Sequence, residues 1–289
     1  MKIIIAGARG FIGKYLQEYF AEHQLVLLTR HPSCNEHYWN PEQGVLDPQL
    51  VEDVDVVINL AGEGIAGRWS QAKLRRIAQS RYQATSLLVR TLAQHAKVKV
   101  YLGASALGYY GADRGSIELD ETSCSGEGVL APICQHWEDL HMSLPNTRVI
   151  VARFGLVLGQ GGFLKKLLPV FRWGMGGIWG DGRQWMSWVA IQDVCQILKF
   201  CIDNPAVTGP VNVTSPQPVT NLEWTWILAQ VLHRPACLRL PKHMLRALLG
   251  ASSELLLGSL RVYPKKLLDE GYRFSQPSLE AALKTLVDL

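Results

Sequence analysis

The chain has 289 residues, with 29 basic and 25 acidic side chains and a formal net charge of +4. Its 48% hydrophobic and 19% charged residues are typical of a globular protein and argue against a disordered, collagen-like or coiled-coil chain. The small charge excess gives no reason to expect nucleic acid as a partner, and no apolar run is long enough to predict a membrane span. The six cysteines show neither a CxxC pair nor a zinc-like spacing, so we expect reduced thiols in a cytoplasmic protein without a metal site.

Short aliphatic runs alternate with helical patterns in the first half of the chain, which predicts parallel βαβ units. Strands are expected at residues 2–6, 25–29, 54–60, 98–105 and 147–154, and helices at 11–22, 70–95 and 133–144. Three prolines punctuate residues 30–49, so a loop with at most a short strand is predicted there. The pattern as a whole predicts an α/β fold with a doubly wound parallel sheet.

The second half begins with a segment rich in glycine, tryptophan and proline, followed by a predicted helix at 191–204 and a short strand at 211–213. Thr220 and Glu223 have the spacing of a capping box, in which each side chain bonds a free backbone N–H of the other residue. A helix should therefore begin there. Residues 241–289 are expected to form short helices, with breaks at Pro264 and Gly271.

A glycine-rich turn joins the first predicted strand to the first predicted helix. Gly7, Gly10 and Gly13 would allow a tight turn, a close approach of the backbone to a pyrophosphate, and tight packing of the helix on the strand. The helix N-terminus would then face the anion. We predict a dinucleotide site here, with Phe11 and Ile12 in the first helical turn; the alternative is a tight turn without a ligand.

The end of the second predicted strand decides between NAD and NADP. An acidic residue there would bind the adenosine ribose and repel a phosphate on it, but the chain has Arg30 at this point and Arg9 inside the glycine turn. One or two such arginines favour NADP over NAD by roughly tenfold to a hundredfold. NADP(H) is therefore the predicted cofactor, and the alternative is that both arginines are solvated surface charges.

Further motifs show a resemblance that spans nearly the whole chain. They are residues 59–62 after one predicted strand, 104–111 after the next, and then 180–188, 210–213, 261–266 and 271–274. With these motifs the chain resembles the extended short-chain dehydrogenases/reductases, and more closely the YfcH-type epimerase family, a subgroup related to nucleotide-sugar epimerases.

The resemblance implies a domain organisation and a chemistry. Residues 1–160 would form a Rossmann-type NADP-binding domain, completed by the strand near 211–213, and residues 161–289 a smaller C-terminal α/β substrate domain. The reaction would be hydride transfer between the nicotinamide and a small, sugar-like or nucleotide-linked substrate. The implied cofactor cleft includes four consecutive residues, Asn59, Leu60, Ala61 and Gly62.

The chain departs from the wider superfamily in the helix predicted at 133–144. That superfamily has a Tyr-x-x-x-Lys pair there, whose lysine lowers the pKa of the tyrosine for proton transfer and anchors the nicotinamide ribose. This chain has Cys134 and Glu138 instead. Ser105 is the candidate for orienting a substrate hydroxyl, and Cys134 and Tyr110 are the candidate general acids or bases. Cys134 could instead be a small buried residue on a helix face.

Two hypotheses about function follow from this departure. The leading one is an NADP(H)-dependent oxidoreductase or nucleotide-sugar-epimerase-like enzyme with an atypical active site. The alternative is a non-catalytic NADPH-binding protein that reports redox state to a partner. The oligomeric state is open in both.

The glycine- and tryptophan-rich segment is the candidate substrate region. Its aromatic side chains are suited to stacking on a sugar-like ligand, although they could equally form a satellite core; they are Trp173, Trp179, Trp185 and Trp188. Arg183 and Trp185 are the candidate substrate contacts. Arg68 and Arg81 frame the loop and helix after residue 62, and each is either a ligand contact or an ordinary exposed charge.

Overall fold

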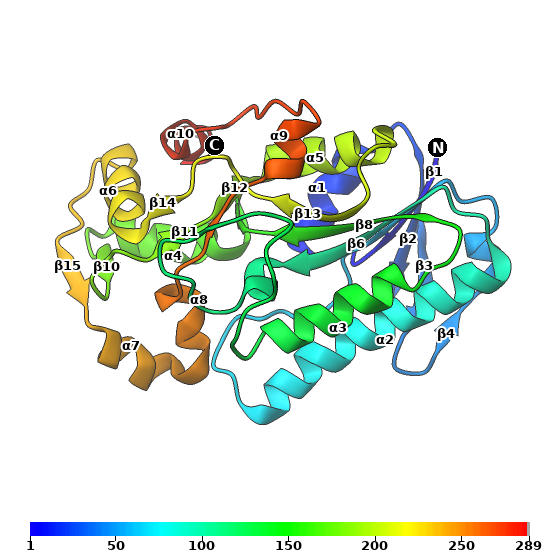
Figure 1. Cartoon of the computed structure of the whole chain (residues 1–289), viewed down its shortest axis with the longest axis horizontal. Coiled ribbons are helices and arrows are strands. Elements are labelled where there is room, and N and C mark those ends of the chain that lie inside the picture. Colours follow the sequence, from blue (N-terminus) through cyan, green and yellow to red (C-terminus); the bar gives the residue numbers. More distant parts are fainter. Residues whose placement is uncertain (288–289) are drawn as a thin grey trace.

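A central sheet of eight strands organises the computed structural model, which describes residues 1–287 (Figure 1). The strand order is β13–β8–β6–β5–β1–β2–β3–β4, and all neighbours run parallel except β3 and β4. The chain winds outward from β1 in both directions, which confirms the prediction of a Rossmann-type doubly wound sheet. The predicted strands are β1 (Lys2–Ala6), β2 (Gln24–Thr29), β5 (Val56–Asn59), β6 (Val100–Ala106), β8 (Arg148–Phe154) and β13 (Gly209–Val213).

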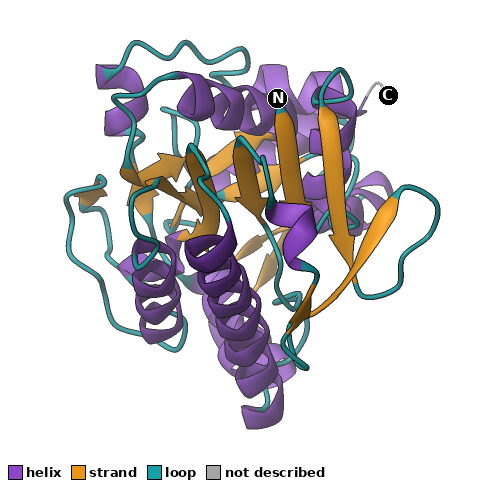
Figure 2. Ribbon diagram, turned by 90° about the vertical axis from the view of Figure 1, so that its right-hand side faces the viewer, coloured by secondary structure: helices purple, strands orange, loops and turns teal. Residues whose placement is uncertain are grey.

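Helices cover both faces of this sheet, as Figure 2 shows in a second view. Helices α2 (Gln71–His95) and α3 (Ala131–Met142) pack side by side on one face, and α1 (Phe11–Tyr19) and α5 (Ile191–Asp203) on the other. Because both faces are covered, the strands carry runs of apolar residues rather than an alternating pattern. In β1, Ile3, Ile4 and Ile5 are all completely buried.

Residues 30–49 differ from the prediction of a loop with at most a short strand. They form β3 (Glu36–Asn40) and β4 (Val45–Leu46), followed by the 3₁₀ turn η1 (Pro48–Val51). Thr29 of β2 is paired with Tyr38, so β3 extends the main sheet. The prolines flank these strands instead of interrupting them, and the buried Trp39 anchors β3 in the core.

The remaining elements are short, and their strands form two-stranded pairs. β7 (Glu118–Leu119) pairs with β16 (Arg261–Val262), β9 (Leu156–Leu158) with β12 (Trp188–Ala190), β10 (Gly177–Trp179) with β15 (Leu238–Leu240), and β11 (Trp185–Met186) with β14 (Val219–Thr220). The helical segments are η2 (Leu107–Tyr110), α4 (Gly162–Arg172), α6 (Asn221–Val231), α7 (Lys242–Leu249), η3 (Gly250–Ser253), α8 (Glu254–Leu257), α9 (Lys265–Asp269) and α10 (Leu279–Val287). The predicted capping box is present at the start of α6, between Thr220 and Glu223.

The segment after residue 160 is closely joined to the sheet. It supplies α5 and β13, and β12 pairs with β9 from before this point. Asp193 at the start of α5 is fully buried and accepts hydrogen bonds from the Ser275 and Gln276 backbone, which ties the C-terminal region to the sheet. The proposed division at residue 160 stays a prediction.

Candidate cofactor and substrate site

The glycine turn lies at the carboxyl end of β1, and its shape depends on glycine at two positions. Gly7 has a φ of +84°, and a Cβ there would lie 2.8 Å from the Leu60 carbonyl. A Cβ on Gly13 would lie 2.4 Å from the Gly7 carbonyl oxygen, so α1 could not pack this closely on the turn. Gly7 therefore lies directly against the backbone of residues 60–61, and Gly13 of α1 directly against the turn.

The first turn of α1 is open to an anion. Gly10 is its N-cap, and among the described residues no side chain caps the helix and no acid stands in its first turn. The first N–H groups of a helix have no intrahelical partner, so they can donate to a phosphate. The ring of Phe11 packs on a second glycine turn, because a Cβ on Gly159 or Gly161 would lie 2.6 or 2.5 Å from it. This backbone fits the diphosphate of a dinucleotide.

The predicted phosphate-binding arginines each stand beside an acid that the sequence analysis did not single out. Arg9 donates two hydrogen bonds to Glu36, from Nε to Oε1 (2.9 Å) and from Nη2 to Oε2 (2.5 Å). These bonds, with others from Ser33, lower the pKa of Glu36 to about 2. Arg30 lies 3.5 Å from Glu42 and is well exposed. Both guanidinium groups border the β2–β3 loop, where the adenosine ribose is expected.

Asn59 holds the turn at residues 60–62 from within the core. Its side chain is completely buried, donates to Thr85 and Tyr101 (3.1 Å each), and accepts from the Ala61 N–H (3.2 Å). The Tyr101 hydroxyl in turn meets Nδ1 of His141 (3.0 Å), whose Nε2 donates to the Ala104 carbonyl (3.1 Å). Burial lowers the pKa of His141 to about 3, so this network is neutral.

The buried ion pair of Glu138 and Arg153 connects two of the predicted catalytic residues, Ser105 and Tyr110. The Ser105 hydroxyl donates to Glu138 Oε1 (2.5 Å), and Arg153 donates to both oxygens of Glu138, from Nε (2.9 Å) and Nη2 (2.8 Å). All three side chains are almost fully buried. Arg153, which follows the apolar run of residues 149–152 in β8, was not predicted, and its charge within a buried strand is the signal that could have identified it.

Tyr110 extends the same network toward β13. Its hydroxyl accepts from Arg153 Nη1 (2.9 Å) and donates to Asn212 Oδ1 (2.7 Å). Burial raises the pKa of Tyr110 to about 12. Tyr109 is partly exposed, and the Arg153 guanidinium lies 3.5 Å above the centre of its ring. The structure therefore places Ser105 and Tyr110 on opposite sides of one buried cation.

Cys134 lies one helical turn before Glu138 on the inner face of α3. It is 5% exposed, and burial followed by the charge of Glu138 raises the pKa of its thiol to about 12. The thiol is therefore protonated at neutral pH. A Cβ on Gly108 would lie 3.4 Å from the sulfur, so the residues after β6 pass directly over it.

The four tryptophans of the substrate candidate do not form one surface. Trp179 and Trp188 are buried in the core, which agrees with the alternative that these aromatic side chains form a satellite core. Trp173 is 80% exposed. Trp185 is partly exposed and lies beneath Arg261, whose guanidinium carbon is 4.8 Å from the ring centre. Arg183 is exposed beside Asp181.

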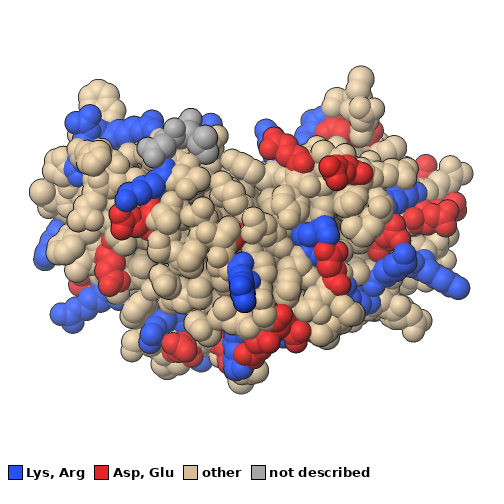
Figure 3. Space-filling view, turned by 90° about the horizontal axis from the view of Figure 1, so that it is seen from above, with Lys and Arg blue, Asp and Glu red and all other residues tan. Residues whose placement is uncertain are grey.

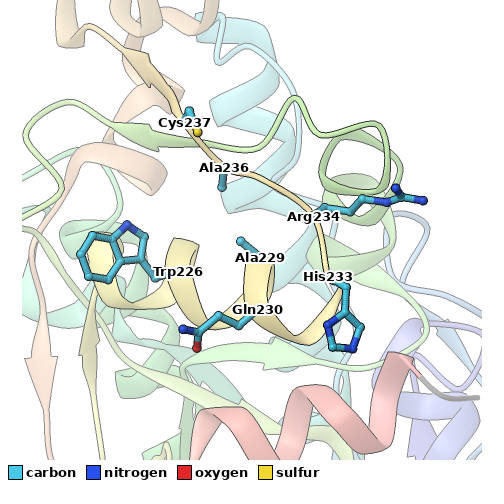
Figure 4. A pocket seen from close by; sticks show the side chains of 7 residues that line it. All are labelled: Trp226, Ala229, Gln230, His233, Arg234, Ala236 and Cys237. Carbon is cyan, nitrogen blue, oxygen red and sulfur yellow. The ribbon is translucent and has the colours of Figure 1, made fainter.

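A groove also lies outside these candidates, on the outer side of α6 and the loop toward β15 (Figure 4). Its lining residues are Trp226, Ala229, Gln230, His233, Arg234, Ala236 and Cys237. On the face shown in Figure 3, basic and acidic side chains are interspersed. Within residues 1–287, no helix is long and apolar enough to cross a bilayer, and no group of three or more His, Cys, Asp or Glu side chains could hold a metal ion.

Comparison with known proteins places these features in a family context. The model of the NAD dependent epimerase/dehydratase family matches residues 3–214, and a domain of unknown function, DUF1731, matches residues 240–286. The epimerase family protein ML0860 of Mycobacterium leprae is 38% identical over 291 residues, which cover 97% of this chain and 94% of that protein.

Solved structures agree with this match. The crystal structure of the human epimerase family protein SDR39U1 with NADPH superposes with a TM-score of 0.92 at 30% identity, covering 100% of this chain and 99% of that one. A UDP-glucuronic acid 4-epimerase from Bacillus cereus, in complex with UDP-glucuronic acid and NAD, gives a TM-score of 0.77 at 17% identity, covering 100% and 98%. At that identity the likeness concerns the fold alone.

Proposed function

The chain belongs to the NAD dependent epimerase/dehydratase family, and from this premise we propose that it is an NADP(H)-dependent oxidoreductase or epimerase-like enzyme. Its substrate is a small nucleotide-linked or sugar-like compound. The cofactor, when bound, supplies or accepts the hydride. The match to the NAD dependent epimerase/dehydratase family supports an epimerase-like reaction.

The observation that carries the cofactor assignment is the pair of arginines beside the open first turn of α1. The turn holds the diphosphate with backbone N–H groups, and Arg9 and Arg30 meet the 2′-phosphate of the adenosine ribose. The NADPH of the human relative supports the same assignment.

The cofactor assignment is tested by titrating wild type and Arg30→Asp with NADPH and NADH, following fluorescence. The variant places a carboxylate where the phosphate lies, so NADPH affinity should fall at least tenfold while NADH affinity is retained. Arg172→Asp makes the same charge change at an exposed position of α4 and serves as the control. Equal affinity for both cofactors, unchanged by Arg30→Asp, would overturn the assignment.

In the proposed reaction, Ser105 orients the substrate and Cys134 exchanges its proton. The Ser105 hydroxyl already donates its hydrogen to Glu138, so its oxygen lone pairs are left to accept from a substrate hydroxyl. The raised pKa of Cys134 keeps the thiol protonated, so in this reaction it acts as a proton donor, and as a weak one because its pKa lies far above neutral pH. Tyr110 fixes the position of Arg153, and through it the carboxylate that holds Ser105.

A screen of carbonyl compounds and nucleotide sugars for NADPH turnover tests the reaction, with Ser105→Ala and Cys134→Ala as variants. Each should lower turnover by about a hundredfold or more while NADPH binding is retained. Cys195→Ala removes another buried thiol, in α5, and is the matched control. Turnover that both variants leave unchanged would remove Ser105 and Cys134 from the site.

A second candidate function is an NADPH-binding protein without turnover. It is favoured by the closed hydrogen bonding of Ser105, Glu138, Arg153 and Tyr110, which satisfy one another in the core. In that case NADPH would bind to wild type, yet no compound of a broad panel would be converted.

A further inference from the structure

Arg81 is a cation in the middle of α2, and its guanidinium is largely withdrawn from water. Its Nη1 donates to the carbonyl oxygens of Glu63 and Ile77, at 3.0 Å each. The guanidinium carbon lies 5.0 Å from the ring centre of Trp137 on the neighbouring α3. These contacts hold the side chain in one orientation. Its Nε and Nη2 make no hydrogen bond with residues 1–287, and the residue is partly exposed.

No acid among residues 1–287 forms a salt bridge with this charge, although the Glu63 carboxylate attracts it from a distance. The carboxylate of Glu63 pairs with Lys73 (2.6 Å) and Arg76 (3.8 Å). Burial lowers the pKa of Arg81 below the usual value of an arginine. A cation withdrawn from water without a counter-ion is unfavourable. Its two unpartnered donors are therefore suited to an anion that comes from outside the chain.

The position of Arg81 indicates which anion this is. A Cβ on Gly62 would lie 3.2 Å from its Cγ and Cζ, so the guanidinium lies directly beneath the turn at residues 60–62. That turn contacts Gly7. Arg9 borders the opposite side of the glycine turn, because β1 stands between β5 and β2 in the sheet. A dinucleotide whose 2′-phosphate meets Arg9 directs its nicotinamide half toward β5 and Arg81.

We propose that the Arg81 guanidinium binds the nicotinamide-side phosphate of NADP(H). This inference rests on the proposed function. It places a positive charge in the nicotinamide half of the site, where Glu138 stands in place of the lysine of the Tyr-x-x-x-Lys pair. A Cβ on Gly62 would lie 3.2 Å from the guanidinium carbon, so a larger residue there would have to push the guanidinium aside by a few tenths of an ångström.

The test compares NADPH with 2′,5′-ADP, which has the adenosine ribose and its 2′-phosphate but lacks the nicotinamide-side phosphate. Arg81→Gln should weaken NADPH binding by about tenfold to a hundredfold and change 2′,5′-ADP binding by less than about twofold. Arg30→Asp should weaken both ligands. Retained 2′,5′-ADP binding also shows that the variant is folded around the glycine turn.

Three outcomes decide the matter. If wild type binds NADPH and Arg81→Gln binds it equally well, the inference is overturned while the proposed function stands. If Arg81→Gln weakens binding of UDP but not of NADPH, Arg81 serves a substrate phosphate and the inference is again overturned. If wild type binds no NADPH, the proposed function itself fails.

Arg81→Lys is the second variant, for the case that the glutamine variant does not fold. The ammonium keeps the charge but loses the planar fork of donors, so we expect a loss of severalfold that is confined to NADPH. A folded lysine variant that binds NADPH as wild type does, or that loses NADPH and 2′,5′-ADP alike, contradicts the proposal.

Discussion

The Glu138–Arg153 ion pair places one negative and one positive charge inside the candidate site. Both partners are nearly inaccessible to water and are joined by two hydrogen bonds, so each neutralises the other. Ser105 and Tyr110 take their positions from this pair. At the scale of single residues, the pair explains how a glutamate is tolerated on the buried face of α3, at the position where the resemblance to the short-chain dehydrogenases/reductases predicts a lysine.

Removing one partner of this pair should destabilise the protein more than replacing both partners with apolar residues. Arg153→Met leaves Glu138 buried without a counter-charge, and the free energy of unfolding should fall by about 3–5 kcal/mol. Glu138→Leu combined with Arg153→Met should recover a substantial part of that loss. Urea unfolding followed by circular dichroism measures both variants. A single variant that costs less than about 1 kcal/mol would show that the pair contributes little.

Glu36 competes with the cofactor for Arg9. Because its carboxylate holds the Arg9 guanidinium through two hydrogen bonds, the 2′-phosphate must share or displace it. Glu36→Gln removes the negative charge, and we expect NADPH to bind about threefold to tenfold more tightly at low ionic strength. Fluorescence titration measures the change, with Glu22→Gln, at an exposed position before β2, as a matched control. Weaker NADPH binding in Glu36→Gln would contradict this role.

His141 should make stability depend on pH. Burial lowers its pKa from 6.5 to about 3, so below pH 6.5 the unfolded chain binds a proton that the native protein does not. The contribution of neutral His141 to the free energy of unfolding is fully present above pH 6.5. It is lost at about 1.4 kcal/mol per pH unit as the pH falls toward 3. Urea unfolding between pH 7 and 5 should show a shallower dependence in His141→Asn. Identical slopes would rule out this contribution.

At the scale of elements, long apolar segments were predictable and short paired ones were not. The strands at 2–6 and 147–154 carry continuous apolar runs, and both were predicted to within one residue. β16 has two residues and exists because it pairs with β7, more than a hundred positions earlier in the chain. A local pattern carries no information about such a partner. The β3–β4 hairpin was missed for a related reason, since its residues are fixed by β2 and by Trp39.

Arg148 caps α5 at its C-terminus. Its guanidinium donates to carbonyl oxygens of Cys201, Ile202 and Asn204, three groups that a helix end leaves without partners. Arg148→Ala should therefore lower the free energy of unfolding by about 2 kcal/mol. Thermal unfolding measures this change, and Lys199→Ala, on the same helix but partly exposed and paired with Asp203, is the control. Equal effects of the two substitutions would contradict the capping role.

At the scale of the whole molecule, the candidate site lies where widely separated segments meet. The glycine turn could be recognised from the sequence because strand, turn and helix are contiguous there. The partners of Ser105 could not be recognised in the same way, because Glu138 and Arg153 come from other elements. Glu121 and Asn212 similarly join the loop after β7 to β13, through a hydrogen bond of 3.0 Å. The cofactor half of the site is therefore local, and the reaction half depends on the tertiary fold.

The glycine turn between β1 and α1 is the proposed binding site of NADP(H). A fluorescence titration of the wild-type protein with NADPH and NADH, under identical salt conditions, tests this binding. We expect NADPH to bind at least tenfold more tightly than NADH, because Arg9 and Arg30 would meet the 2′-phosphate. Equal binding of the two, or no binding of either, would contradict it.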